Sequence, residues 1–160
     1  ALVIISIFTG ISEGIQPLVS RSYGKGEKDN VKKVYKYGVI TAISISIVVY
    51  LVSFIYAEPI VTIFNRENDP VLMNMAVDGM KFYFTAFIFV GINVITSIFF
   101  SSTDNPKPAF IISIMRGFVV IVPMAFIMSR LFGMTGVWLT LTVSELIVSC
   151  FSMFIVRKNI

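Results

Sequence analysis

An all-α fold that crosses a membrane several times is predicted by how apolar and charged residues alternate along the chain. Hydrophobic residues make up 56% of the 160 residues, and the mean hydropathy is +0.88. At a rise of about 1.5 Å per residue, roughly 20 helical residues cover the hydrocarbon core of a bilayer. Apolar runs of this length predict helices, because barrel strands alternate apolar and polar residues. We expect a single membrane domain with five spans, at about 1–22, 37–57, 82–102, 109–130 and 136–156.

The first two predicted spans are joined by a short polar turn. Tyr23–Gly26 carries two glycines, which is a typical signal for the end of a helix. Pro17 lies inside the first span and predicts a kink near Glu13. The second helix is expected to begin in the basic segment Lys28–Lys36 and to end near Pro59.

The connection to the third span, residues 59–81, is the longest in the chain. Its apolar segment Ile60–Phe64 predicts a short helix that covers one end of the bundle. Asn68–Pro70 is a helix-start signal, in which a capping side chain precedes proline at the first helical position. The third span then ends in a tight turn at Ser101–Pro106.

The last two spans carry their own helix-breaking residues. Pro123 predicts a second kink, in the fourth span. Gly133 and Gly136 predict a short turn between the fourth and fifth spans. Trp138 opens the fifth span near the membrane surface, where tryptophan is favoured.

The charged loops predict the orientation of the five spans. Alternate loops place nine Lys and Arg residues on one side of the membrane and three on the other. Cytoplasmic loops carry the excess of positive charge, so the side with nine is expected to be cytoplasmic. The sequence therefore predicts a multi-pass protein of the cell membrane whose C-terminus is cytoplasmic.

The composition argues against several classes of function. The chain contains no histidine and one cysteine, Cys150, and it has no zinc, phosphate-loop or nucleophile-elbow motif. We therefore expect no enzyme activity, no bound metal and no cofactor. The basic residues lie beside predicted spans, where they set orientation, so nucleic-acid binding is not expected.

Glu13 is the most informative polar residue, because it lies near the middle of the first predicted span. A carboxylate at that depth costs about 2.5–3.5 kcal/mol and normally faces a cavity or a partner. Helical spacing places further polar side chains on the same face, and the complete set is Thr9, Glu13, Gln16 and Ser20. This face could bind a proton, Na⁺ or an organic cation, or it could form helix–helix hydrogen bonds.

Two other spans contribute polar residues at a similar depth. Glu145 in the fifth span could line the same cavity, or it could form an ion pair with Arg116 of the fourth span. Asn93, Thr96 and Ser97 form the polar face of the third span. Such residues either line a substrate path or join neighbouring helices.

Several segments resemble the multidrug and toxic compound extrusion (MATE) family, in the order and spacing seen in that family. The first is GISEGIQPLVSRSYG at Gly10–Gly24, which is followed by a basic segment. Further similar segments follow across nearly the whole chain, at Glu58–Arg66, Phe89–Asn93, Phe99–Ser102, Lys107–Arg116 and Gly136–Leu139 with Glu145.

The resemblance implies two lobes of six helices each, of which this chain would supply the last five helices, without the N-terminal lobe. It also implies export of small organic cations, driven by inward movement of Na⁺ or H⁺ through alternating access. Glu13 and Gln16 match the motif and are expected to face the cavity. Two alternatives remain open: a flippase for lipid-linked sugars from the same superfamily, or a membrane assembly subunit that transports nothing.

Overall fold

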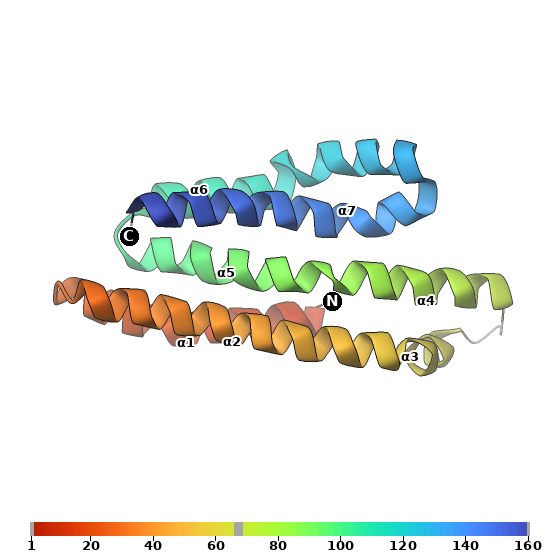
Figure 1. Cartoon of the computed structure of the whole chain (residues 1–160), viewed down its shortest axis with the longest axis horizontal. Coiled ribbons are helices and arrows are strands. Elements are labelled where there is room, and N and C mark those ends of the chain that lie inside the picture. The colour runs from red at the N-terminus through yellow and green to blue at the C-terminus, as the bar shows by residue number, and fades with distance from the viewer. Residues whose placement is uncertain (1, 66–68, 160) are drawn as a thin grey trace.

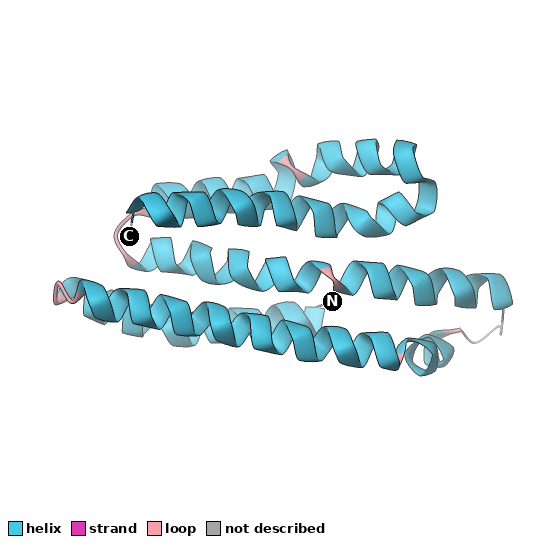
Figure 2. Ribbon diagram, viewed as in Figure 1, coloured by secondary structure: helices cyan, strands magenta, loops and turns pink. Residues whose placement is uncertain are grey.

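The structure, a computed structural model, describes residues 2–65 and 69–159, and nearly all of them are helical. No strand occurs within those two ranges, so the predicted all-α class is confirmed. Figures 1 and 2 show long helices joined by short turns. The elements are α1 (Leu2–Gly24), α2 (Lys28–Ile55), α3 (Ala57–Phe64), α4 (Pro70–Phe84), α5 (Ala86–Ser102), α6 (Pro106–Ile114), the π-helical segment η1 (Met115–Val119) and α7 (Ile121–Asn159).

Helix α5 is the central element of the bundle. It packs against α1 and α2 on one side and against α6 and α7 on the other (Figure 1). Its side chains are the most completely buried of any span, and they include Phe87, Asn93 and Phe100. Two apolar clusters hold it in place, because Phe87 packs with Phe8 of α1, and Phe100 packs with residues of α6 and α7.

Four stretches are long and apolar enough to cross a membrane, and the last of them accounts for two of the five predicted spans. That stretch, Pro106–Lys158, has 53 residues and would extend about 80 Å as one straight helix. It reverses direction at Gly133, which has φ 57° and ψ −132° (Figure 1). A positive φ is accessible to glycine because glycine has no Cβ, so the predicted glycine turn is present.

The helix that contains the third predicted span begins at the predicted start signal and is interrupted near its middle. It begins at Pro70, capped by Asp69, whose Oδ1 accepts hydrogen bonds from the backbone N–H groups of Val71 and Leu72. The interruption is at Thr85. Hydroxyl groups of Thr85 and Thr142 both donate to the carbonyl of Phe82, at 2.6 and 3.2 Å, and so compete with the helical ladder.

The two prolines differ in their local surroundings. Helix α1 runs without interruption through Pro17. Pro123 lies in the first turn of α7, four residues after the end of η1, where the helix widens to a π-helix. Proline cannot donate to the carbonyl four residues earlier, and its ring crowds that carbonyl. The irregularity therefore lies in the turn before Pro123 instead of at the proline itself.

The short helix expected at Ile60–Phe64 is present as α3 and begins three residues earlier.

Candidate functional site

The polar face of α1 is exposed along its length, and only Ser20 at its end bonds to another described helix. Thr9, Glu13, Gln16 and Ser20 are all exposed. The buried residues of α1 lie on the opposite side, where Phe8 and Val19 are completely inaccessible. Within the described residues, Glu13 forms no hydrogen bond or ion pair. The bundle therefore leaves a carboxylate, a carboxamide and hydroxyl groups on a face that it does not itself cover.

Two glycines extend this open face. A methyl group added at Gly10 or Gly14 would meet no atom within 4 Å. The close helix contact that their spacing permits is therefore not made by any described part of this chain. Thr9 donates to the carbonyl of Ile5 at 2.9 Å, and Ser20 donates to the carbonyl of Ser102 of α5 at 3.3 Å. Among these four polar residues, only Ser20 forms a hydrogen bond with another helix of the described bundle.

Glu145 lies in the interior, and both of its carboxylate oxygens have partners. Arg116 Nε of η1 donates to one oxygen at 2.7 Å, and Asn93 Nδ2 of α5 donates to the other at 2.7 Å. Asn93 also donates to the Glu145 backbone carbonyl at 3.0 Å and accepts from Ser152 at 3.0 Å. The pairing of Glu145 with Arg116, one of the two alternatives from the sequence, is present.

This network joins three separate parts of the chain: α5, η1 and the second half of α7. Glu145 is 4% exposed and Asn93 is fully buried, so both are shielded from solvent and lipid. A buried carboxylate would be costly alone, and here a guanidinium balances its charge while an amide completes its hydrogen bonds. The arrangement holds an ion pair inside the bundle.

The other two polar residues of α5 also join helices. Thr96 is fully buried and shares a hydrogen bond of 2.9 Å with the hydroxyl of Tyr35 on α2. Ser97 lies 3.2 Å from the hydroxyl of Ser113 on α6. In the described chain, therefore, the polar face of α5 contacts neighbouring helices on both sides.

The candidate residues thus form two separate groups. The α1 group is open, and the group around Glu145 is enclosed; no hydrogen bond or ion pair connects them among the described residues.

The sequence did not single out Tyr35, because a tyrosine in a basic segment has the pattern of an interfacial residue. Ser12 and Ser144 are buried with unpaired hydroxyl oxygens in the described structure, which no sequence pattern indicates.

No cluster of metal-ligating side chains occurs in the part of the chain that the structure describes.

A comparison with known protein families identifies the family of this chain. A family model described as MatE matches residues 1–127, which is most of the chain. The chain belongs to the MatE family. The resemblance noted from the sequence motifs is therefore confirmed, and the chain belongs to a family of multi-pass membrane transporters, not enzymes.

Relatives of this MatE chain are considerably longer than the chain itself. It is 30% identical over 150 residues to a protein named multidrug export protein MepA from Staphylococcus saprophyticus. That alignment covers 94% of this chain and 32% of the relative. The MatE chain therefore spans about a third of the length of the curated relatives it matches.

Solved transporter structures share the fold of this MatE chain. An inward-facing multidrug resistance MATE family transporter superposes with a TM-score of 0.92 at 17% identity, covering 99% of this chain and 37% of that one. An outward-facing structure gives a TM-score of 0.89 at 16% identity, covering 99% and 35%. The fold of this MatE chain is thus nearly equally similar to the inward-facing and the outward-facing transporter structures.

Proposed function

We propose that this MatE chain supplies the last five helices of a two-lobe, twelve-helix secondary transporter that exports small organic cations. Inward movement of Na⁺ or H⁺ would drive export by alternating access. Family membership, the export function in the name of the relative MepA, and the coverage of a third of its length support this proposal. The N-terminal lobe would be the main partner of the chain.

The open polar face of α1 is the observation that carries the proposal. An acid near the middle of a span requires a cavity or a partner, and no described residue of this bundle forms a hydrogen bond or ion pair with Glu13. A lobe on the other side of α1 would enclose that face. The enclosed space would then contain one carboxylate from this chain, with Gln16 and Thr9 beside it.

We propose different roles for the two predicted acids, because their surroundings differ. Glu145 is neutralised by Arg116, so it offers no net negative charge to a substrate. Glu13 has no such partner among the described residues and can hold one cation at a time. A proton or Na⁺ bound there would exclude an organic cation, and this competition couples the two movements.

Similarity to both inward-facing and outward-facing structures supports a rocking mechanism. The arrangement of α1–α7 corresponds to that of one conformation almost as well as to that of the other. The five helices would therefore move together against the opposite lobe, and access to Glu13 would alternate as the lobes separate at one end and then the other. We place Lys25, Lys107 and the C-terminus on the cytoplasmic side of the cell membrane, from the distribution of positive charge.

Replacing Glu13 by Gln tests the proposal in the complete gene product. The change keeps size and hydrogen-bonding capacity but removes the exchangeable charge. Efflux of a fluorescent organic cation such as ethidium from cells is expected to fall by about tenfold or more, the usual scale of coupling between two ligands. Protein in the membrane is quantified alongside, and it is expected to be unchanged because Glu13 contacts no other described helix.

Two further variants make the result specific. Glu13→Asp keeps the charge and is expected to retain a measurable part of the efflux. Glu58→Gln makes the same chemical change at an exposed acid of α3 and should leave efflux intact. Normal efflux by Glu13→Gln would remove Glu13 from the mechanism and would favour a role for this face in assembly.

A further inference from the structure

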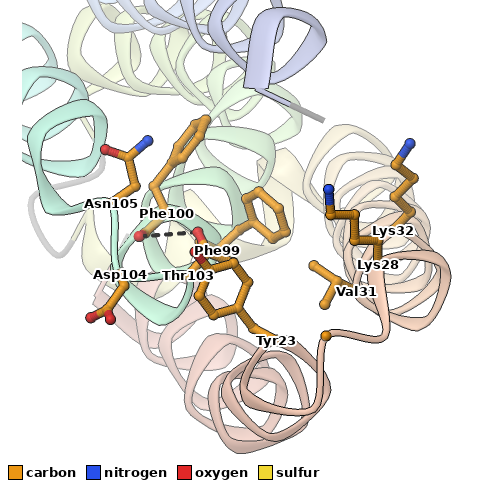
Figure 3. A pocket seen from close by; sticks show the side chains of 10 residues that line it. Tyr23, Lys28, Val31, Lys32, Phe99, Phe100, Thr103, Asp104 and Asn105 are labelled. Atoms are coloured by element: carbon orange, nitrogen blue, oxygen red, sulfur yellow. Dashed lines mark hydrogen bonds between the residues drawn. The ribbon is translucent and has the colours of Figure 1, made fainter.

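A cavity of about 660 Å³ lies at the end of the bundle where α1 and α5 end and α2 begins. Its volume is in the range of small-molecule pockets, about 300–1,000 Å³. Figure 3 shows Lys28 and Lys32 on one side and Asp104 and Asn105 on the other. The cavity is far along α1 from Glu13, so it is a site of its own.

The walls of this cavity combine positive charge with an apolar floor. Lys28 and Lys32 are one helical turn apart on α2, so their side chains extend from the same face. Phe99 and Tyr23 provide aromatic surface between the two polar walls. A ligand that fits this lining needs a negative group and an apolar portion.

The two lysines have no carboxylate partner in the described structure. Arg116–Glu145 is the one ion pair formed by described residues. Of the two acids that flank Lys28 in the sequence, Glu27 accepts a hydrogen bond from Asn30 at 2.7 Å, and Asp29 forms no ion pair with either lysine. Lys25, Lys33 and Lys36 add further positive charge to the same segment. Two lysines without an ion-pair partner in the described structure therefore line a cavity that is large enough to admit a ligand.

The opposite wall restricts which anion is suitable. Asp104 carries a negative charge, and Asn105 offers an amide next to it. A free phosphate dianion would be repelled by the Asp104 carboxylate. A phosphodiester carries a single negative charge, and a hydroxyl group attached to it can donate to Asp104.

We propose that this cavity binds the headgroup of an anionic phospholipid of the phosphatidylglycerol type. The phosphate lies between Lys28 and Lys32, the glycerol hydroxyls donate to Asp104 and Asn105, and the acyl chains follow exposed apolar side chains along the bundle. The cavity lies just beyond the uncharged span 37–57, at the level of lipid headgroups. Clusters of lysines at the cytoplasmic end of a span are typical of anionic lipid binding.

Native mass spectrometry of the complete gene product tests the proposal. The protein is reconstituted in nanodiscs of phosphatidylcholine and phosphatidylglycerol at 3:1 and then transferred to detergent, and retained lipids are identified. Selective retention of phosphatidylglycerol is expected for the unmodified protein. The double variant Lys28→Gln/Lys32→Gln is expected to retain at least about tenfold less of it, since each lysine near an anionic surface contributes to binding.

The matched control is Lys25→Gln/Lys36→Gln. It removes the same charge from the same segment, but neither residue lines the cavity. The control is expected to retain phosphatidylglycerol within a few-fold of the unmodified protein. An equal loss in both double variants would indicate diffuse attraction, and no loss in either would exclude the lysines; each result would overturn the site.

A competition measurement separates a lipid from a soluble anion. Inorganic phosphate at millimolar concentration is expected to leave phosphatidylglycerol bound, because it lacks both the acyl chains and the hydroxyl donors. Full displacement by phosphate would show a free-phosphate site and would overturn the lipid assignment. Thermal unfolding in pure phosphatidylcholine nanodiscs checks that the variants remain folded.

Discussion

Glu13 and Glu145 carry the same side chain at similar depths, but the surrounding residues place them in opposite electrostatic conditions. Arg116 and Asn93 satisfy both oxygens of Glu145, and the residue is 4% exposed. Glu13 is exposed and has no partner among the described residues. The difference arises because α5 and η1 approach α7 at Glu145, whereas no described helix approaches α1 at Glu13.

The ion pair predicts how single and double substitutions at these positions compare. Glu145→Met leaves the Arg116 guanidinium largely shielded and uncompensated, so we expect a loss of stability on the order of 3 kcal/mol. Arg116→Met leaves the Glu145 carboxylate buried without a counter-charge and is expected to cost a similar amount. The double variant Glu145→Met/Arg116→Met is expected to be more stable than either single variant, because apolar residues of similar size replace both charges.

The measurement is thermal unfolding of the purified protein in nanodiscs, analysed as a double-mutant cycle. Asn93 remains in all variants, so its lost hydrogen bond contributes equally wherever Glu145 is changed. Additive destabilisation in the double variant would show that the two charges do not stabilise each other.

At the scale of elements, the two halves of the region after α5 are shaped by prolines and glycines. The helix widens at η1, one turn before Pro123 removes a backbone donor. Gly133 then allows the reversal through its positive φ, and Gly136 allows the returning arm to approach the outgoing one. One apolar stretch of 53 residues thereby becomes two antiparallel spans.

Gly136 predicts the sharpest effect of a small substitution on an element. An added methyl group would overlap the backbone carbonyl of Met128 on the other arm of α7, and backbone cannot move aside as a flexible side chain can. Gly136→Ala is therefore expected to destabilise the protein by about 1–3 kcal/mol, the usual cost of overpacking. Its thermal midpoint in nanodiscs should fall accordingly.

Gly117→Ala is the control for this prediction. Gly117 is also a helical glycine of the same region, but a methyl group there meets nothing within 4 Å. Its thermal midpoint is expected to stay level or rise. Equal midpoints for the two variants would show that the arms of α7 separate at little cost.

At the scale of the whole molecule, the bundle buries α5 and leaves much apolar surface on its other helices. Phe64, Phe110 and Phe154 are among the large side chains that are more than half exposed. In a lipid bilayer such surface costs little, because hydrocarbon surrounds it. The same face of α1 that carries Glu13 is the exception, since its polar side chains are unsuited to lipid and indicate an enclosed space.

The proposed orientation of the whole bundle can be tested with single cysteines. In a Cys150→Ser background, Glu58→Cys and Arg130→Cys are expected to react with a membrane-impermeant maleimide in intact cells. Lys25→Cys and Lys107→Cys are expected to react only after permeabilisation, because the positive charge is concentrated on their side. All four positions are exposed, so a missing reaction reports the side of the membrane and not burial.

The reverse labelling pattern would contradict the orientation. It would also place the proposed lipid site in the outer leaflet. Labelling of all four positions in intact cells would show instead that the cysteine variants do not insert with a single topology.

The sequence by itself determined the helical class, the membrane location and most of the element boundaries. Apolar runs of about 20 residues permit few other structures in lipid, since each backbone group must be bonded within its own segment. The cap at Asp69, the turn at Gly133 and the polar face of α1 follow from local rules: capping oxygens, positive φ and the period of 3.6 residues. The family motifs are likewise visible in linear order.

Only the tertiary structure decided what the polar residues contact. Whether Glu145 would face a cavity or Arg116 depended on how η1 meets α7, and the partner of Thr96 depended on how α2 crosses α5. These contacts join residues 29 and 61 positions apart in the chain. Periodicity places a side chain on a face, but the neighbour of that face is set by packing among all the helices. For that reason two similar acids in the sequence became one buried ion pair and one open carboxylate.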